Sequence, residues 1–73
     1  MPSRRFKNQK LKAAYEACRR LAAEGNFAED APPGEMYGVM HKRYWNGRNR
    51  TGKVPEYGSV AYAAWAAGVD DRK

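Results

Sequence analysis

Apolar residues recur at every third or fourth position between residues 8 and 24, which is the spacing of one face of an α-helix. The stripe consists of Leu11, Ala14, Tyr15, Cys18, Leu21 and Ala22. Asn8 has a typical helix N-cap side chain, and Gly25 suits the left-handed position that often follows a helix. We therefore predict a helix over residues 8–24.

A second apolar pattern lies in residues 35–46. Its members on one helical face are Met36, Tyr37, Met40 and Tyr44. Gly38 weakens a helix by about 1 kcal/mol relative to Ala, and the β-favouring residues of 39–45 leave a strand as the alternative. We favour a helix that ends near Gly47.

A third helix is predicted after Ser59, whose side chain can cap it, and Gly68 can end it. Small alanines surround Trp65, which we expect to contribute most of the buried surface. Residues 25–34 and 47–58 carry Pro and Gly and are predicted loops, with Phe27 tucked under the first.

The expected fold is all-α, a small compact domain of about three helices with long loops and a flexible basic N-terminal arm. Residues 1–73 form one domain, with residues 1–7 as the arm and residues 70–73 as a frayed tail. The predicted core is Leu11, Tyr15, Cys18, Leu21, Met40, Tyr44, Tyr62 and Trp65.

Charge is unevenly distributed along this chain of net charge +6. Residues 1–20 and 41–53 are basic, and the intervening residues 21–40 carry acids and no cation. Basic blocks attract polyanions, either nucleic acid or acidic protein. The acidic segment repels phosphates over a Debye length of about 8–10 Å, so we favour a protein surface of mixed sign.

Motifs of catalysis or metal binding do not stand out in the sequence. His41 is the single histidine and Cys18 the single cysteine, so the chain lacks the paired ligands typical of a zinc site. We expect a protein without enzymatic activity, cofactor, metal or catalytic residue. No apolar run approaches the ~20 residues of a membrane span, and we expect a cytoplasmic monomer with no membrane partner.

The stretch KRYWNGRNRTGK at residues 42–53 is the strongest functional signal. Arginines make forked bonds to carboxylate or phosphate, and Trp45 lies about 100° from the core face of the helix, where it can anchor a partner. The short basic arm is the second candidate. The predicted partner-binding residues are Arg4, Arg5, Lys7, Lys10, Lys42, Arg43, Trp45, Arg48, Arg50 and Lys53.

Residues 44–68 are similar to the ribosome modulation factor family. The shared positions, in order, are Tyr44, Gly47, Pro55, Tyr57, Trp65 and Gly68. Glu56 splits the family's Pro-Tyr pair, and Val54 stands where the family has Cys. This resemblance implies binding to ribosomal RNA and protein and the silencing of ribosomes.

In length, charge and composition the whole chain resembles the small transcription regulators of lytic Xanthomonas phages. That resemblance implies binding to host bacterial RNA polymerase near the N-terminus of the β′ subunit, inhibition of σ-dependent initiation, and antitermination. It has no motif behind it, so no residue roles carry over. RNA polymerase is our expected partner, and a ribosome or plain nucleic acid is the alternative.

Overall fold

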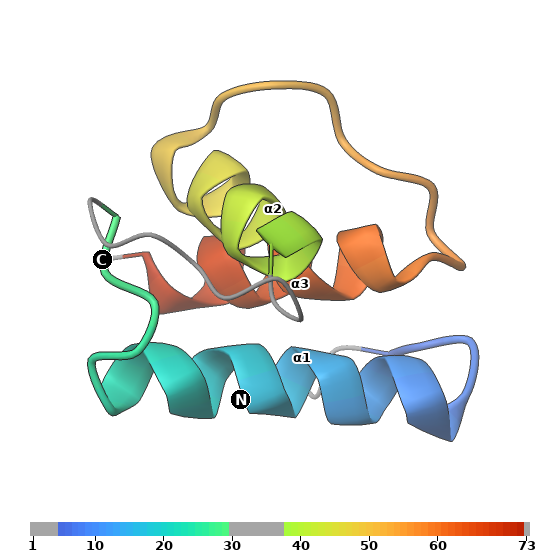
Figure 1. The fold of residues 1–73 in the computed structure, drawn as a ribbon. Coiled ribbons are helices and arrows are strands. Elements are labelled where there is room, and N and C mark those ends of the chain that lie inside the picture. The colour runs from blue at the N-terminus through green and yellow to red at the C-terminus, as the bar shows by residue number, and fades with distance from the viewer. Residues whose placement is uncertain (1–4, 30–37, 73) are drawn as a thin grey trace.

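The computed structural model describes residues 5–29 and 38–72, and this part of the chain is helical without strands. Helices α1 (Gln9–Ala23), α2 (Gly38–Asn49) and α3 (Val60–Asp71) confirm the predicted all-α class. Figure 1 shows α3 lying between the other two, and α1 and α2 each pack mainly against it. No helix among the described residues is long and apolar enough to cross a membrane.

The predicted helix starts are confirmed by their hydrogen bonds. The Asn8 side chain accepts a 3.0 Å hydrogen bond from the Leu11 amide, and Ser59 Oγ accepts one of 3.1 Å from the Tyr62 amide. Each bond satisfies an amide that has no partner within its helix. These two polar residues therefore fix where α1 and α3 begin.

Helix α1 ends at Ala23, and Gly25 takes the predicted left-handed position just beyond it, with a φ of 83°. The amide of the following Asn26 donates a 2.8 Å hydrogen bond back to the Leu21 carbonyl. This is the Schellman arrangement, in which a left-handed residue lets the chain reverse over the last turn. Glycine suits that position because it has no Cβ to clash.

Helix α2 confirms the helical interpretation of residues 39–45, but its predicted end near Gly47 is wrong. The helix continues to Asn49, and Arg50 then takes the left-handed position with a φ of 57°. The Thr51 amide donates a 2.9 Å bond to the Asn46 carbonyl, repeating the pattern at the end of α1. Residues 35–37 lie outside the described residues.

Two glycines set the contact between α2 and α3. A Cβ on Gly47 would lie closer than 3.0 Å to the Trp65 carbonyl oxygen, and one on Gly68 closer than 3.0 Å to the Tyr44 carbonyl oxygen. The two helix backbones are therefore in direct contact, Gly47 of α2 against α3 and Gly68 of α3 against α2. Gly68 does not end α3 as predicted, because this close packing and the contacts of Asp71 outweigh its weak helix propensity.

The predicted frayed tail is consequently wrong at Asp70 and Asp71, which belong to α3 and are hydrogen-bonded. Lys73 lies outside the described residues. At the other end of the chain, the Phe6 ring lies 4.9 Å from the Tyr15 ring and 6.4 Å from the Tyr62 ring, centroid to centroid. Phe6 thus holds residues 5–7 against the helices, whereas residues 1–4 lie outside the described part.

The centre of the core is smaller in side-chain volume than predicted. Its buried cluster is Cys18, Phe27, Tyr44, Ala64 and Ala67. Leu11 is also buried, as expected, and Phe27 packs under its loop as predicted. The other predicted core residues are only half-buried, because the alanines of α3 let neighbouring helices come close and leave large side chains at the edges. These residues are Tyr15, Leu21, Met40, Tyr62 and Trp65.

Candidate interaction surface

The loop between α2 and α3, residues 50–58, is mostly exposed to solvent. It carries the predicted cations Arg50 and Lys53 together with two exposed apolar side chains. Val54 is 61% exposed and Tyr57 is 49% exposed. A run of cations beside exposed apolar groups has the composition of a docking surface, which needs both charge and desolvated area.

The N-terminal segment meets the end of this loop, although the two are far apart in sequence. The Tyr57 hydroxyl donates a 3.1 Å hydrogen bond to the Arg5 carbonyl. The Lys7 side chain lies against Gly58, where a Cβ would approach its Cδ to 3.1 Å. Figure 1 shows the loop running from the end of α2 to the side of the molecule where α1 begins.

The two predicted basic segments therefore meet at Tyr57 and Gly58, and the loop extends from there to Arg50 at its far end (Figure 1). We call a set of exposed residues from these two segments the basic edge. Its members are Arg5, Lys7, Arg50, Lys53, Val54 and Tyr57. Glu56 is an exposed acid within the same loop. Lys10 and Lys42 are also exposed, on the first turn of α1 and on α2, Arg43 is half-buried, and Arg4 lies outside the described residues.

Trp45 is not the free anchor that its helical phase predicted. Its indole N–H donates a 2.6 Å hydrogen bond to the Phe27 carbonyl, and its ring packs edge-on against Tyr44 at 5.5 Å. The loop after α1 covers this side of α2, which helical periodicity alone does not reveal. Trp45 is thereby part of the structural contact between the loop after α1 and α2.

Arg48 is likewise held by its own helix. Its guanidinium lies 5.0 Å from the Trp45 ring centroid and donates a 3.3 Å hydrogen bond to the Tyr44 hydroxyl. The remaining guanidinium donors of this half-buried residue are left for other acceptors. Arg48 thus differs from Arg50, whose side chain is exposed in the loop.

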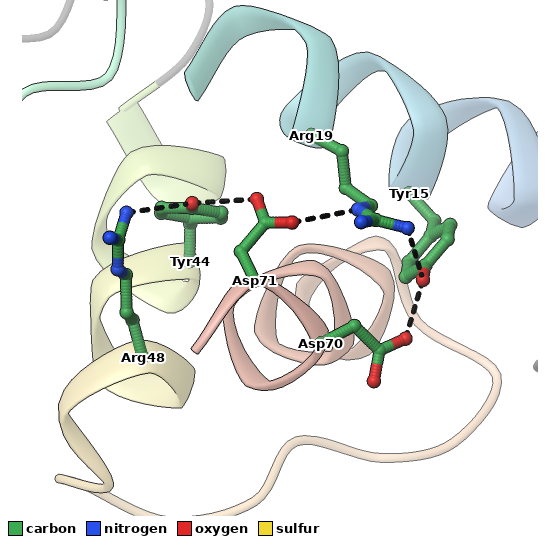
Figure 2. Close-up of polar contacts among 6 residues, drawn as sticks. All are labelled: Tyr15, Arg19, Tyr44, Arg48, Asp70 and Asp71. Atoms are coloured by element: carbon green, nitrogen blue, oxygen red, sulfur yellow. Dashed lines mark hydrogen bonds and ion pairs between the residues drawn. The ribbon is translucent and has the colours of Figure 1, made fainter. Parts of the chain in front are cut away.

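A polar cluster that the sequence analysis missed ties the three helices together (Figure 2). Both α1 and α2 carry a Tyr-x-x-x-Arg pair, which places the two side chains on one helical face. The pairs are Tyr15 with Arg19 and Tyr44 with Arg48. Both pairs contact the consecutive aspartates Asp70 and Asp71 at the end of α3. The repeated Tyr-x-x-x-Arg spacing and the Asp-Asp pair are the sequence features from which this cluster could have been predicted.

Asp71 is the shared acceptor of this polar cluster. It accepts a 2.8 Å hydrogen bond from the Tyr44 hydroxyl and a 2.8 Å ion-paired bond from Arg19. Tyr15 donates to the neighbouring Asp70 and accepts a 3.3 Å bond from Arg19. The last turn of α3 is thus fixed to both other helices.

The ionisation of three groups follows from these surroundings. Burial, reinforced by the hydrogen bond to Asp71, raises the pKa of Tyr44 to about 12. Burial also raises the pKa of Tyr15, and the hydrogen bond to Asp71 raises the pKa of Arg19. The tyrosines are therefore neutral donors and Arg19 a permanent cation near neutral pH.

Cys18 lies at the centre of the core with no exposed surface. Burial, aided by the charge of Asp71, raises the pKa of its thiol to about 12. The thiol is accordingly protonated near neutral pH, and a buried neutral thiol is a poor nucleophile. His41 has a structural contact, because its ring Nε2 lies 2.9 Å from the Ala28 carbonyl oxygen.

Groups of three or more potential metal-ligating side chains are absent from residues 5–29 and 38–72. Comparison of the chain with protein-family models, with curated proteins and with solved structures finds no match.

Proposed function

We propose that this protein is a non-enzymatic, phage-type regulator that binds bacterial RNA polymerase through its basic edge and inhibits σ-dependent initiation. One observation carries the proposal: Arg50, an exposed cation, occupies a left-handed backbone position. The corresponding position after α1 is filled by Gly25.

A left-handed conformation costs a non-glycine residue roughly 1–2 kcal/mol. A glycine at position 50 would avoid that cost while keeping the same turn. Strained residues concentrate at sites where the side chain is needed for function. The geometry at Arg50 is what a contact residue needs, because the turn projects a cation from the rigid end of α2.

The apolar members of the basic edge favour a protein partner over bare nucleic acid. Val54 and Tyr57 offer area that a partner can desolvate, and Glu56 would repel a phosphate backbone. Arg and Tyr are enriched among the residues that dominate protein interfaces. An acidic surface of RNA polymerase with an apolar centre complements this combination.

The proposal is tested by capturing bacterial lysate proteins on the tagged full-length chain. We expect recovery of RNA polymerase subunits, identified by mass spectrometry, and loss of that recovery for Arg50→Glu combined with Lys53→Glu. The matched control is Lys12→Glu combined with Arg72→Glu, which makes the same charge change at two exposed positions outside the basic edge. Capture of ribosomes without polymerase, or equal capture by both variants, contradicts the proposal.

Inhibition of initiation is a separate expectation. Added protein should reduce σ-dependent transcripts from a promoter template, and Arg50→Glu with Lys53→Glu should restore them. The same reaction with a downstream terminator measures read-through, which antitermination would increase. Unchanged initiation in the presence of bound protein would remove the inhibitory role while leaving polymerase binding in place.

A ribosome-binding function is the second candidate, and the α2–α3 contact favours it. Four of the six residues shared with the ribosome modulation factor family build that contact, namely Tyr44, Gly47, Trp65 and Gly68. The similarity to that family thus includes the residues that pack α2 against α3. This candidate predicts co-sedimentation with ribosomal particles that weakens steeply with salt, and absence from all ribosomal fractions at low salt excludes it.

A further inference from the structure

The molecule has an open groove, distinct from the basic edge, between α1 and α2 beside the end of α3. Its volume is about 600 Å³. Alanines Ala22 and Ala23 of α1 give it apolar surface, and the buried Tyr44 lies at its base. Arg19 and Arg20 line it from α1, and Arg48 lines it from α2. We propose that this groove binds an acidic peptide segment of a partner protein, with apolar residues between its acids.

The arginines of the groove have N–H donors that are not used in hydrogen bonds among the described residues. The Arg20 guanidinium makes no hydrogen bond or ion pair with any residue of the described ranges. Arg19 uses its Nε on Asp71 and one terminal nitrogen on the Tyr15 hydroxyl. Arg48 uses one terminal nitrogen on the Tyr44 hydroxyl. A guanidinium carries five N–H donors, so each side of the groove can bind a carboxylate while the polar cluster stays intact.

Charge complementarity selects an acidic ligand. Among the described residues, three arginines line the groove, and its acids are Asp71 and Glu16. Asp71 is already neutralised by Arg19 and hydrogen-bonded by Tyr44. The groove therefore offers a net positive charge from two helices, with donors of Arg20 on the α1 side and of Arg48 on the α2 side.

The lining also favours a peptide over a nucleic-acid backbone. The alanine side chains can bury apolar groups of a ligand, and a sugar-phosphate chain does not supply such groups in series. A run of phosphates along the groove would also pass the carboxylate of Glu16. A peptide can place its acids only at the arginines and its apolar residues at the alanines.

The inference is tested with the isolated full-length chain, labelled with ¹⁵N, so that it does not depend on RNA polymerase. The probes are a synthetic peptide of Glu with interspersed Leu, a peptide of Glu alone, and an oligouridylate RNA. We expect the Glu/Leu peptide to bind most tightly and to shift the amides of Ala22, Tyr44 and Asp71 saturably.

Arg20→Glu should lower the affinity for the Glu/Leu peptide by about tenfold or more, because a charged hydrogen bond is replaced by repulsion. Arg20 is exposed, so this change leaves the fold intact. Lys12→Glu is the control, since it makes the same change on α1 away from the groove. Arg20→Lys should retain most of the affinity.

Three results would overturn the inference: the absence of saturable shifts, shifts confined to residues 50–58, or tighter binding of the RNA in the groove. The first and third results leave the proposed role of the basic edge untouched, because the titration contains no polymerase. The second result would move the acidic-peptide site to the basic edge. Conversely, loss of polymerase capture by Arg50→Glu with Lys53→Glu leaves the groove assignment untouched.

Discussion

At the scale of single residues, Tyr44 shows how a buried polar atom is accommodated. Its side chain has no exposed surface, yet its hydroxyl donates to Asp71 and accepts from Arg48. Both bonds involve a charged partner, and such bonds are stronger than neutral ones. The ring supplies packing while the hydroxyl joins α2 to α3.

Replacing Tyr44 by Phe should therefore lower the free energy of unfolding by about 1–2 kcal/mol. The ring packing persists, but Asp71 and Arg48 each lose a partner. Urea denaturation followed by circular dichroism measures the change. Tyr57→Phe is the control, because it removes only an exposed hydroxyl contact and should change stability by less than about 0.5 kcal/mol.

Arg50→Gly should raise the free energy of unfolding by about 0.5–1 kcal/mol, since glycine adopts the left-handed position without strain. The reciprocal change Gly25→Arg should destabilise by about 1 kcal/mol at the equivalent position after α1. Denaturant midpoints of the two variants should move in opposite directions. If Arg50→Gly is also as good a polymerase binder as the parent, the strain at Arg50 has no functional explanation.

At the scale of elements, the glycines decide how α2 and α3 pack. Gly68→Ala should destabilise the protein by about 1–3 kcal/mol, because its Cβ meets the Tyr44 backbone, which cannot move without separating the helices. Gly38→Ala is the matched control in α2. A Cβ there meets nothing within 4 Å, so this variant should be neutral or gain up to about 1 kcal/mol. Thermal unfolding of both variants separates packing from helix propensity.

Local signals in the sequence predicted the three helices and the starts of α1 and α3. Asn8, Gly25 and Ser59 act through contacts with residues a few positions away, which a single sequence displays. Gly47 and Gly68 look like helix ends because their role depends on a second helix. The polar cluster and the cover over Trp45 depend in the same way on long-range contacts.

The residues of the candidate site also differ in whether local sequence or long-range contacts reveal them. The exposed cations of the basic edge were predicted, because charge density needs no tertiary information. Val54 and Tyr57 were not among the predicted contacts, since apolar residues in a loop show their exposure only in the fold. The groove was also not predicted, because its arginines come from two helices that meet beside α3.

At the scale of the whole molecule, buried protonated groups make the free energy of unfolding decrease at alkaline pH. The pKa of Cys18 rises from 9.0 to about 12, and that of Tyr44 from 10.0 to about 12. The unfolded chain loses these protons at lower pH than the folded one. Stability due to these groups is therefore complete below about pH 9 and decreases as pH rises toward 12.

Urea midpoints measured from pH 8 to pH 11 should accordingly fall with increasing pH. Cys18→Ala removes one contributor, so its midpoint should start lower because of the lost packing but decline less steeply. A parallel decline in both proteins would exclude the thiol as a contributor. Thiol-reactive reagents provide an independent measurement, since Cys18 should react only as fast as the protein opens.

The backbone contact at Gly47 and Gly68 has a consequence for how this small protein can diversify. Because α2 and α3 are locked by their own main chains, the connection between them contributes little to holding them in register. That connection can therefore be exchanged or lengthened at small entropic cost. Libraries randomised over residues 51–57 should yield folded variants with new binding preferences, with the interlocked helices acting as a display scaffold.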